Sequence, residues 1–145
     1  MSKTQTLALI KSLDWKALKS ALAAYPDLLN ARGPKGENLL HLCCGVDFTK
    51  RSRRKKESLK TAATLLDAGL DINAEAFTEG DWKATPLWYA IGRGKNLELA
   101  KYSDAKHIRM FLEHGANIDL KDGEGTTVRA LLNRARDPRY PALLA

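Results

Sequence analysis

The stretch Thr85-Pro86-Leu87-Trp88-Tyr89-Ala90 carries the signals with which an α-helix begins. A Thr side chain accepts hydrogen bonds from the first backbone N–H groups of a helix, and Pro suits the first turn, where an N–H would have no partner. Leu87, Ala90 and Ile91 follow at the i, i+3, i+4 spacing that puts apolar side chains on one helical face. We therefore expect a helix here with one buried face.

The same apolar triplet returns along the chain. It is formed again by Leu40, Cys43 and Cys44 and by Val128, Leu131 and Leu132. A second triplet alternates with it, at Leu18-Ala21-Leu22, Ala62-Leu65-Leu66 and Ile108-Phe111-Leu112. Two amphipathic helices and a turn, repeated, predict a solenoid, because one such unit cannot bury its own apolar face. Solenoids of this kind usually bind other macromolecules.

These stretches resemble the ankyrin-repeat family. Residues 85–90 are similar to its Thr-Pro-Leu-His-x-Ala signature, with Trp88 in place of the His, and residues 36–43 keep a weaker version that retains His41. Residues 65–74 and 111–119 resemble the family's Leu-Leu-x-x-Gly-Ala-x-Val-Asn-Ala ending, in which Gly closes the second helix. The resemblance implies that His41 supports the neighbouring turn by hydrogen bonding.

The resemblance also implies an all-α ankyrin solenoid of about four helix–turn–helix units with β-turn or hairpin fingers and atypical, capping first and last units. We expect one domain over residues 1–145, with units near 1–31, 32–74, 75–120 and 121–145. The period is unusual, because Leu40 and the equivalent Leu87 are 47 residues apart, against about 33 in the family. The surplus falls between the first and second helices. It forms either a binding face or a lengthened connection without a role.

The first insertion, residues 49–60, holds seven basic residues and one acidic residue, whereas the whole chain has a net charge of +7. The basic patch consists of Lys50, Arg51, Arg53, Arg54, Lys55, Lys56 and Lys60. Three uses remain open: docking to an acidic protein surface, contact with nucleic acid or anionic lipid, and a solvated extension with no special role. A short basic run of this kind also fits a nuclear-import signal in a eukaryote.

Aromatic residues near the third unit are the predicted partner-binding residues. Phe77 and Trp82 lie in a lengthened turn before the helix, and Trp88 and Tyr89 lie on the first helix, which by resemblance lines the concave groove. Trp and Tyr are favoured anchors in interfaces. The alternative is that these side chains only pack the irregular turn against the helix. Trp15 shares a helical face with Leu18 and Leu22, so we expect it in the core.

The sequence carries no recognisable catalytic, cofactor-binding or metal-binding motif. Cys43 and Cys44 take inward positions, so we expect two buried thiols in a reducing compartment, and with His41 they match no zinc spacing. No apolar run approaches the roughly 20 residues of a membrane span.

We therefore expect a non-enzymatic, monomeric, cytoplasmic protein (nuclear in a eukaryote) without cofactors. It would bind one partner protein with an acidic surface through its groove and its insertions, as an inhibitor, an immunity-type protein or a regulator. The alternative is a binder of anionic surfaces or nucleic acid through residues 50–60.

Overall fold

A computed structural model describes residues 2–46, 54–77, 83–93, 105–121 and 124–144. Within these ranges the chain is mostly helical. The helices are α1 (Lys3–Ser12), α2 (Trp15–Ala24), the 3₁₀ helix η1 (Pro26–Asn30), α3 (Leu39–Cys43), α4 (Arg54–Asp67), α5 (Pro86–Arg93), α6 (Ala105–Glu113), α7 (Val128–Arg134) and α8 (Arg139–Ala142). Two short strands, β1 (Ala76–Phe77) and β2 (Lys83–Ala84), pair antiparallel.

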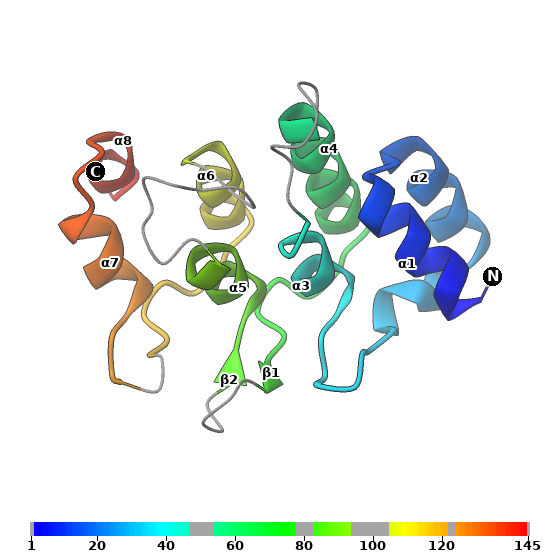
Figure 1. The fold of residues 1–145 in the computed structure, drawn as a ribbon, viewed down its shortest axis with the longest axis horizontal. Coiled ribbons are helices and arrows are strands. Elements are labelled where there is room, and N and C mark those ends of the chain that lie inside the picture. Colours follow the sequence, from blue (N-terminus) through cyan, green and yellow to red (C-terminus); the bar gives the residue numbers. More distant parts are fainter. Residues whose placement is uncertain (1, 47–53, 78–82, 94–104, 122–123, 145) are drawn as a thin grey trace.

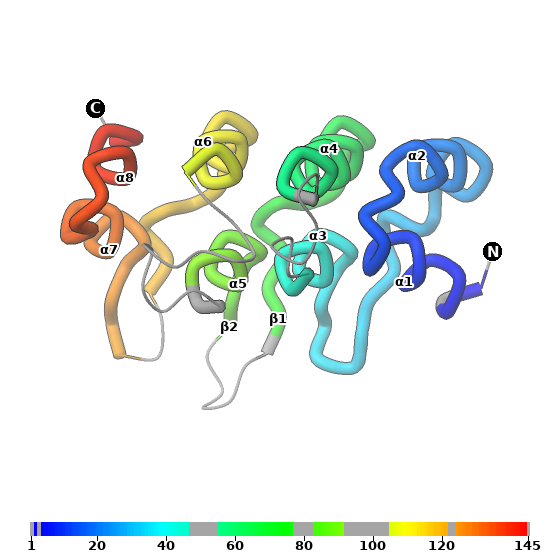
Figure 2. The backbone as a smooth tube through the Cα atoms, turned by 45° about the horizontal axis from the view of Figure 1, so that its top comes forward, coloured from blue at the N-terminus to red at the C-terminus, as the bar shows by residue number. Residues whose placement is uncertain are grey.

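The helices form two parallel rows that run from the N-terminus at one end of the molecule to the C-terminus at the other (Figure 1). The inner row contains α1, α3, α5 and α7, and the outer row contains α2, α4, α6 and α8 (Figure 2). Each inner helix packs on the outer helix that follows it in sequence, α3 also packs on α1 and α5, and α4 also packs on α2 and α6. The β1–β2 ladder projects on the side of the inner row (Figure 1).

The helix ends follow from local chemistry. Asn38 and Thr127 cap α3 and α7 with side-chain oxygens. At the start of α5, the Thr85 hydroxyl accepts a hydrogen bond from the backbone N–H of Trp88 at 3.4 Å. Gly69 and Gly115 follow α4 and α6 with φ of 95° and 85°. Glycine adopts this left-handed conformation without steric cost, as expected for the residue that ends the second helix.

The apolar triplets form the core between the two rows. Leu40, Leu87, Leu65 and Ile108 have no exposed surface, and Leu66 is also buried. Full burial of one such side chain stabilises the fold by about 1.5–3 kcal/mol. The alternation of inner and outer triplets is therefore what joins the rows.

The last inner helix corrects one expectation. Gly125 and Gly36 share a φ of 84°, and the capping residues Thr127 and Asn38 each stand two positions later. Val128 is therefore equivalent to Leu39, the residue directly after the cap of α3, and not to Leu40 as the apolar triplets predict. The predicted triplet of this unit is thus out of register by one residue.

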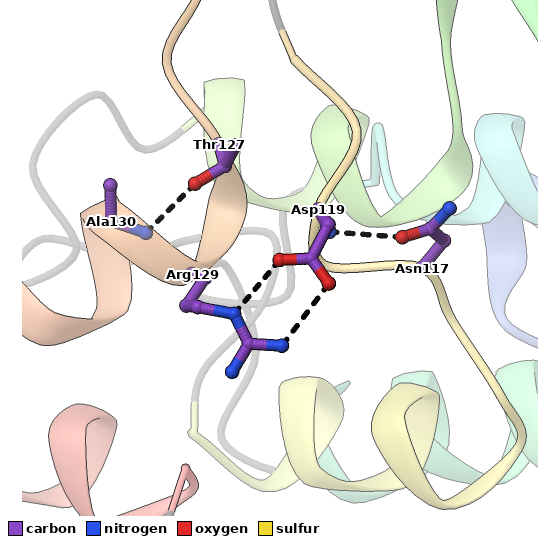
Figure 3. Close-up of polar contacts among 5 residues, drawn as sticks. All are labelled: Asn117, Asp119, Thr127, Arg129 and Ala130. Atoms are coloured by element: carbon purple, nitrogen blue, oxygen red, sulfur yellow. Dashed lines mark hydrogen bonds and ion pairs between the residues drawn. The ribbon is translucent and has the colours of Figure 1, made fainter.

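Arg129 stands where the earlier units have a buried Leu, and it points outward instead. Its Nε and Nη2 atoms donate to Oδ1 and Oδ2 of Asp119 at 2.8 and 3.1 Å (Figure 3). These hydrogen bonds hold the pKa of the exposed Asp119 carboxyl below its ordinary value. The ion pair explains how the last inner helix tolerates a charge at this position.

Neighbouring turns are tied to one another by side-chain hydrogen bonds. Asn73 Nδ2 donates to the carbonyl of Gly115 at 3.1 Å, and the backbone N–H of Asn117 donates to Asn73 Oδ1 at 2.9 Å. Each bond joins residues more than 40 positions apart. They fix how one turn sits beside the next.

Candidate functional site

One half-buried position recurs along the inner row of helices. Leu42, Tyr89 and Leu131 each stand four residues after the capping residue of α3, α5 and α7. In α3 and in the described part of α5, Leu42 and Tyr89 are the side chains that are not fully buried. Leu131 is half-buried as well. We call these three residues the inner-face row.

A hollow of about 320 Å³ adjoins the N-terminal end of the inner-face row. It lies between α1, η1, the turn at residues 31–37 and α3, and its apolar walls include Leu7, Leu28, Pro34 and Leu42. Because Leu42 belongs to both, the hollow and the row form one continuous surface. Mostly apolar pockets of this size are typical of binding sites.

Tyr89 rests on a rigid support. Its ring meets the ring of His41 edge-on, with 4.6 Å between centroids and 77° between planes. The His41 Nε2 atom lies 2.9 Å from the Ala84 carbonyl, and the Asn38 backbone N–H donates to Nδ1 at 3.1 Å. These partners assign the hydrogen of a neutral ring to Nε2, which therefore donates to Ala84.

Burial lowers the pKa of His41 below its ordinary 6.5, although the hydrogen bond to Ala84 acts in the opposite direction. Ala84 belongs to β2, which precedes the next inner helix. The role that the resemblance implied for His41, support of the neighbouring turn, is confirmed.

Trp88 does not lie on this surface. Its side chain is 4% exposed, and its indole Nε1–H donates to the Leu120 carbonyl at 3.1 Å. The ring therefore packs between α5 and the turn that follows α6. This placement agrees with the alternative that Trp88 only packs the structure, and we remove it from the candidate partner contacts.

The other two aromatic candidates are not tested by the structure. Phe77 belongs to β1, where its backbone pairs with Lys83, but its side chain lies outside the described part of the molecule. Trp82 lies outside the described residues altogether. Both stay predictions.

The basic patch is described only in part. Lys50, Arg51 and Arg53 lie outside the described residues, and Arg54 begins α4 without a described side chain. Lys55 is half-buried, and the other two lysines of the patch, Lys56 and Lys60, are exposed. The basic segment therefore continues into a helix of the outer row rather than ending in a loop.

A second, larger hollow lies between α2 and α4. Its volume is about 560 Å³, and Trp15, Leu22, Leu29 and Ala63 are among the residues that line it. Trp15 is only half-buried and is not part of the core cluster, so the expectation of a core tryptophan is wrong. The reason is its place at the first residue of α2, beyond the buried face formed by the rest of that helix.

Lysine side chains surround Trp15. The Nζ atoms of Lys60 and Lys16 lie 4.8 and 5.5 Å from the centroid of its ring. At these distances an ammonium group is attracted to the face of the aromatic ring. Sequence patterns could not reveal this cluster, because Trp15 and Lys60 belong to different helices whose packing decides the contact.

Sequence patterns also do not predict a buried contact between a serine and a histidine. Ser58 Oγ and His107 Nε2 lie 3.0 Å apart between α4 and α6, and both residues are almost without exposed surface. A nucleophile must be reachable by its substrate. This pair instead joins two outer helices through a satisfied polar contact.

The two cysteines are buried and not joined by a disulfide, and burial raises the pKa of Cys43 to about 12. In the ranges that the structure describes, no group of three His, Cys, Asp or Glu side chains could hold a metal ion. Over the same ranges, no helix has both the length and the apolar character needed to cross a membrane.

Within the described ranges, the helices are paired in two rows and joined by turns. The family model of the ankyrin repeat matches residues 82–123, which include α5 and α6. Over these residues the chain is similar to an ankyrin repeat. Ankyrin repeats generally mediate protein–protein interaction and are typically not enzymes. No curated protein matches the chain.

Proposed function

We propose that the chain is a stack of four ankyrin units, near residues 1–31, 32–74, 75–120 and 121–145, that binds one partner protein on its inner face. The observation that carries this proposal is the inner-face row. Three successive inner helices carry a half-buried Leu or Tyr at the same position, and an apolar hollow continues the row at one end. An apolar row flanked by polar turns is the arrangement of an interface core with its rim.

The residues suit a partner segment that lies across the inner helices. The hollow would take one apolar side chain of the partner. Tyr89, on the next inner helix, would offer an aromatic surface further along the row. Tyr89 is held in place by His41, so little side-chain entropy is lost when a partner binds. Phe77 of β1 and Trp82, which lies outside the described residues, are proposed to extend the contact.

Such a module acts by occupying a surface of its partner. An inhibitor, an immunity-type protein or a regulator is the corresponding biological role, because each works by binding without chemistry. The basic patch favours a partner with an acidic surface, since opposite charges speed the encounter. We propose that the protein acts in the cytoplasm, as a monomer.

The proposal is tested by recovery of partners from native cell extract at low and at high salt. We expect one protein in a stoichiometric complex that survives high salt, because an apolar contact is not screened by ions. The alternative is an anionic-surface or nucleic-acid binder that uses residues 50–60. It predicts salt-labile recovery of nucleic acid or lipid without a stoichiometric protein.

A further inference from the structure

The larger hollow, between α2 and α4, has the character of a second binding site. Its lining residues come from the outer row and η1, and it shares none of them with the hollow beside α1 and α3. The two outer helices lie side by side in both views of the fold (Figure 1, Figure 2). A ligand here would therefore not compete with one on the inner-face row.

The floor of this hollow is apolar and its rim is basic. Leu22, Leu29 and Ala63 contribute apolar surface, while Lys19 and Lys60 carry positive charge into the lining. Lys16 adds a further ammonium group over Trp15. A complementary ligand would place an apolar side chain on the floor of the hollow and carboxylates at its rim.

One acidic residue lines the hollow, and it does not reverse this character. Asp67 is largely exposed, and its Oδ1 atom lies 3.7 Å from Nε2 of His114. Lys60, which also lines the hollow, lies about one helical turn after the exposed Lys56 on α4. The basic segment therefore leads up to the rim of the hollow, where its charge would steer an acidic ligand.

The chemistry favours a protein segment over nucleic acid. Among the described residues that line the hollow, Trp15 is the one aromatic residue, so successive bases would have no second ring on which to stack. The apolar floor would face a phosphate backbone with nothing to solvate it. A peptide can supply an apolar side chain and carboxylates together.

We propose that the hollow between α2 and α4 is a docking site for an acidic segment of a partner protein, with an apolar side chain over Leu22 and Ala63 and carboxylates at Lys19 and Lys60. This site goes beyond the proposed function, because it uses the outer row. It gives the protein two separable surfaces. A partner could engage both, or two partners could bind at once.

The test uses the full chain and a panel of peptides of about 12 residues in which Phe, Leu or Trp is flanked by Asp and Glu. Binding is followed by NMR at the indole N–H of Trp15, assigned by its loss in Trp15→Phe. We expect saturable shifts with acidic peptides and none with matched Asn and Gln peptides. The double variant Lys19→Gln/Lys60→Gln should weaken binding about tenfold.

A control variant of equal net charge, Lys35→Gln/Lys121→Gln, should bind as the wild type does, and so should Tyr89→Ala on the inner face. The proposal is overturned if acidic and neutral peptides bind alike, if the control variant weakens binding equally, or if no peptide shifts Trp15. It is also overturned if a single-stranded oligonucleotide shifts Trp15 more strongly than every peptide does. If Tyr89→Ala still binds the acidic peptides, the site between α2 and α4 is independent of the inner face, and each of the two proposals can fail without the other.

Discussion

The ring of His41 donates a hydrogen bond from Nε2 to the carbonyl of Ala84, 43 residues later in the chain, over 2.9 Å. This bond joins α3 to the strand that leads into α5. It also holds the ring against which Tyr89 packs. One buried side chain therefore links the stability of the stack to the geometry of its inner face.

Replacing His41 should destabilise the fold. In His41→Ala the Ala84 carbonyl and the Asn38 N–H lose a buried partner, and an unsatisfied buried group costs about 1–3 kcal/mol. The free energy of unfolding, from urea titration followed by circular dichroism, checks this. The matched control is His114→Ala at an exposed position, which should change stability by less than about 0.5 kcal/mol. Equal effects of the two variants would contradict the structural role of His41.

His41 should also make stability depend on pH. Its pKa in the folded state lies below the ordinary 6.5, so the unfolded chain binds the proton more readily. Stability should thus be fully present above about pH 6.5 and decline as the pH falls through the folded-state pKa. Urea titrations from pH 7.5 to 5 measure this slope. We expect His41→Gln to flatten it, and an unchanged slope would assign the effect to other groups.

Trp88 should matter for stability and not for binding. Trp88→Phe keeps an aromatic ring but loses the bond to the Leu120 carbonyl, which should cost about 1–3 kcal/mol. Trp88→Ala should cost about 3–5 kcal/mol, since it leaves a cavity. Thermal unfolding measures both. A variant that folds as stably as the wild type but loses its partner would instead make Trp88 a contact residue.

The basic patch should be dispensable for folding and important for encounter. Replacing Arg53, Arg54, Lys55 and Lys56 together with Gln should change the free energy of unfolding by less than about 1 kcal/mol. The association rate with an acidic partner should fall, and its dependence on salt should become weaker. Stopped-flow binding at two salt concentrations tests this. Unchanged association at low salt would mean that the patch is only a solvated extension.

The sequence predicts the helices well because their signals are local. The triplet around Leu87, the capping residue Thr85 and the glycine at position 69 act within one or two turns, and each behaves as expected. The register of the last unit was wrong because Arg129 fills an apolar position with an outward ion pair, which a pattern of apolar residues does not anticipate.

The surfaces were harder to predict, because burial depends on which helices meet. Trp88, a predicted partner contact, is covered by the turn after α6. Trp15, predicted to lie in the core, lines a hollow instead. The contact of Ser58 with His107 spans 49 residues and likewise depends on packing. Among the described residues, Tyr89, which is half-buried on α5, remains the aromatic candidate on the inner face.

The inner-face account is tested most directly by calorimetric titration of an identified partner with wild type, Leu42→Ala, Tyr89→Ala and Tyr25→Ala. Tyr25 is the matched control, because it is 49% exposed and directly follows an outer helix. The account predicts that Leu42→Ala and Tyr89→Ala fold and lose about 2 kcal/mol or more of binding free energy, while Tyr25→Ala binds normally. Normal binding by folded Leu42→Ala and Tyr89→Ala would contradict it.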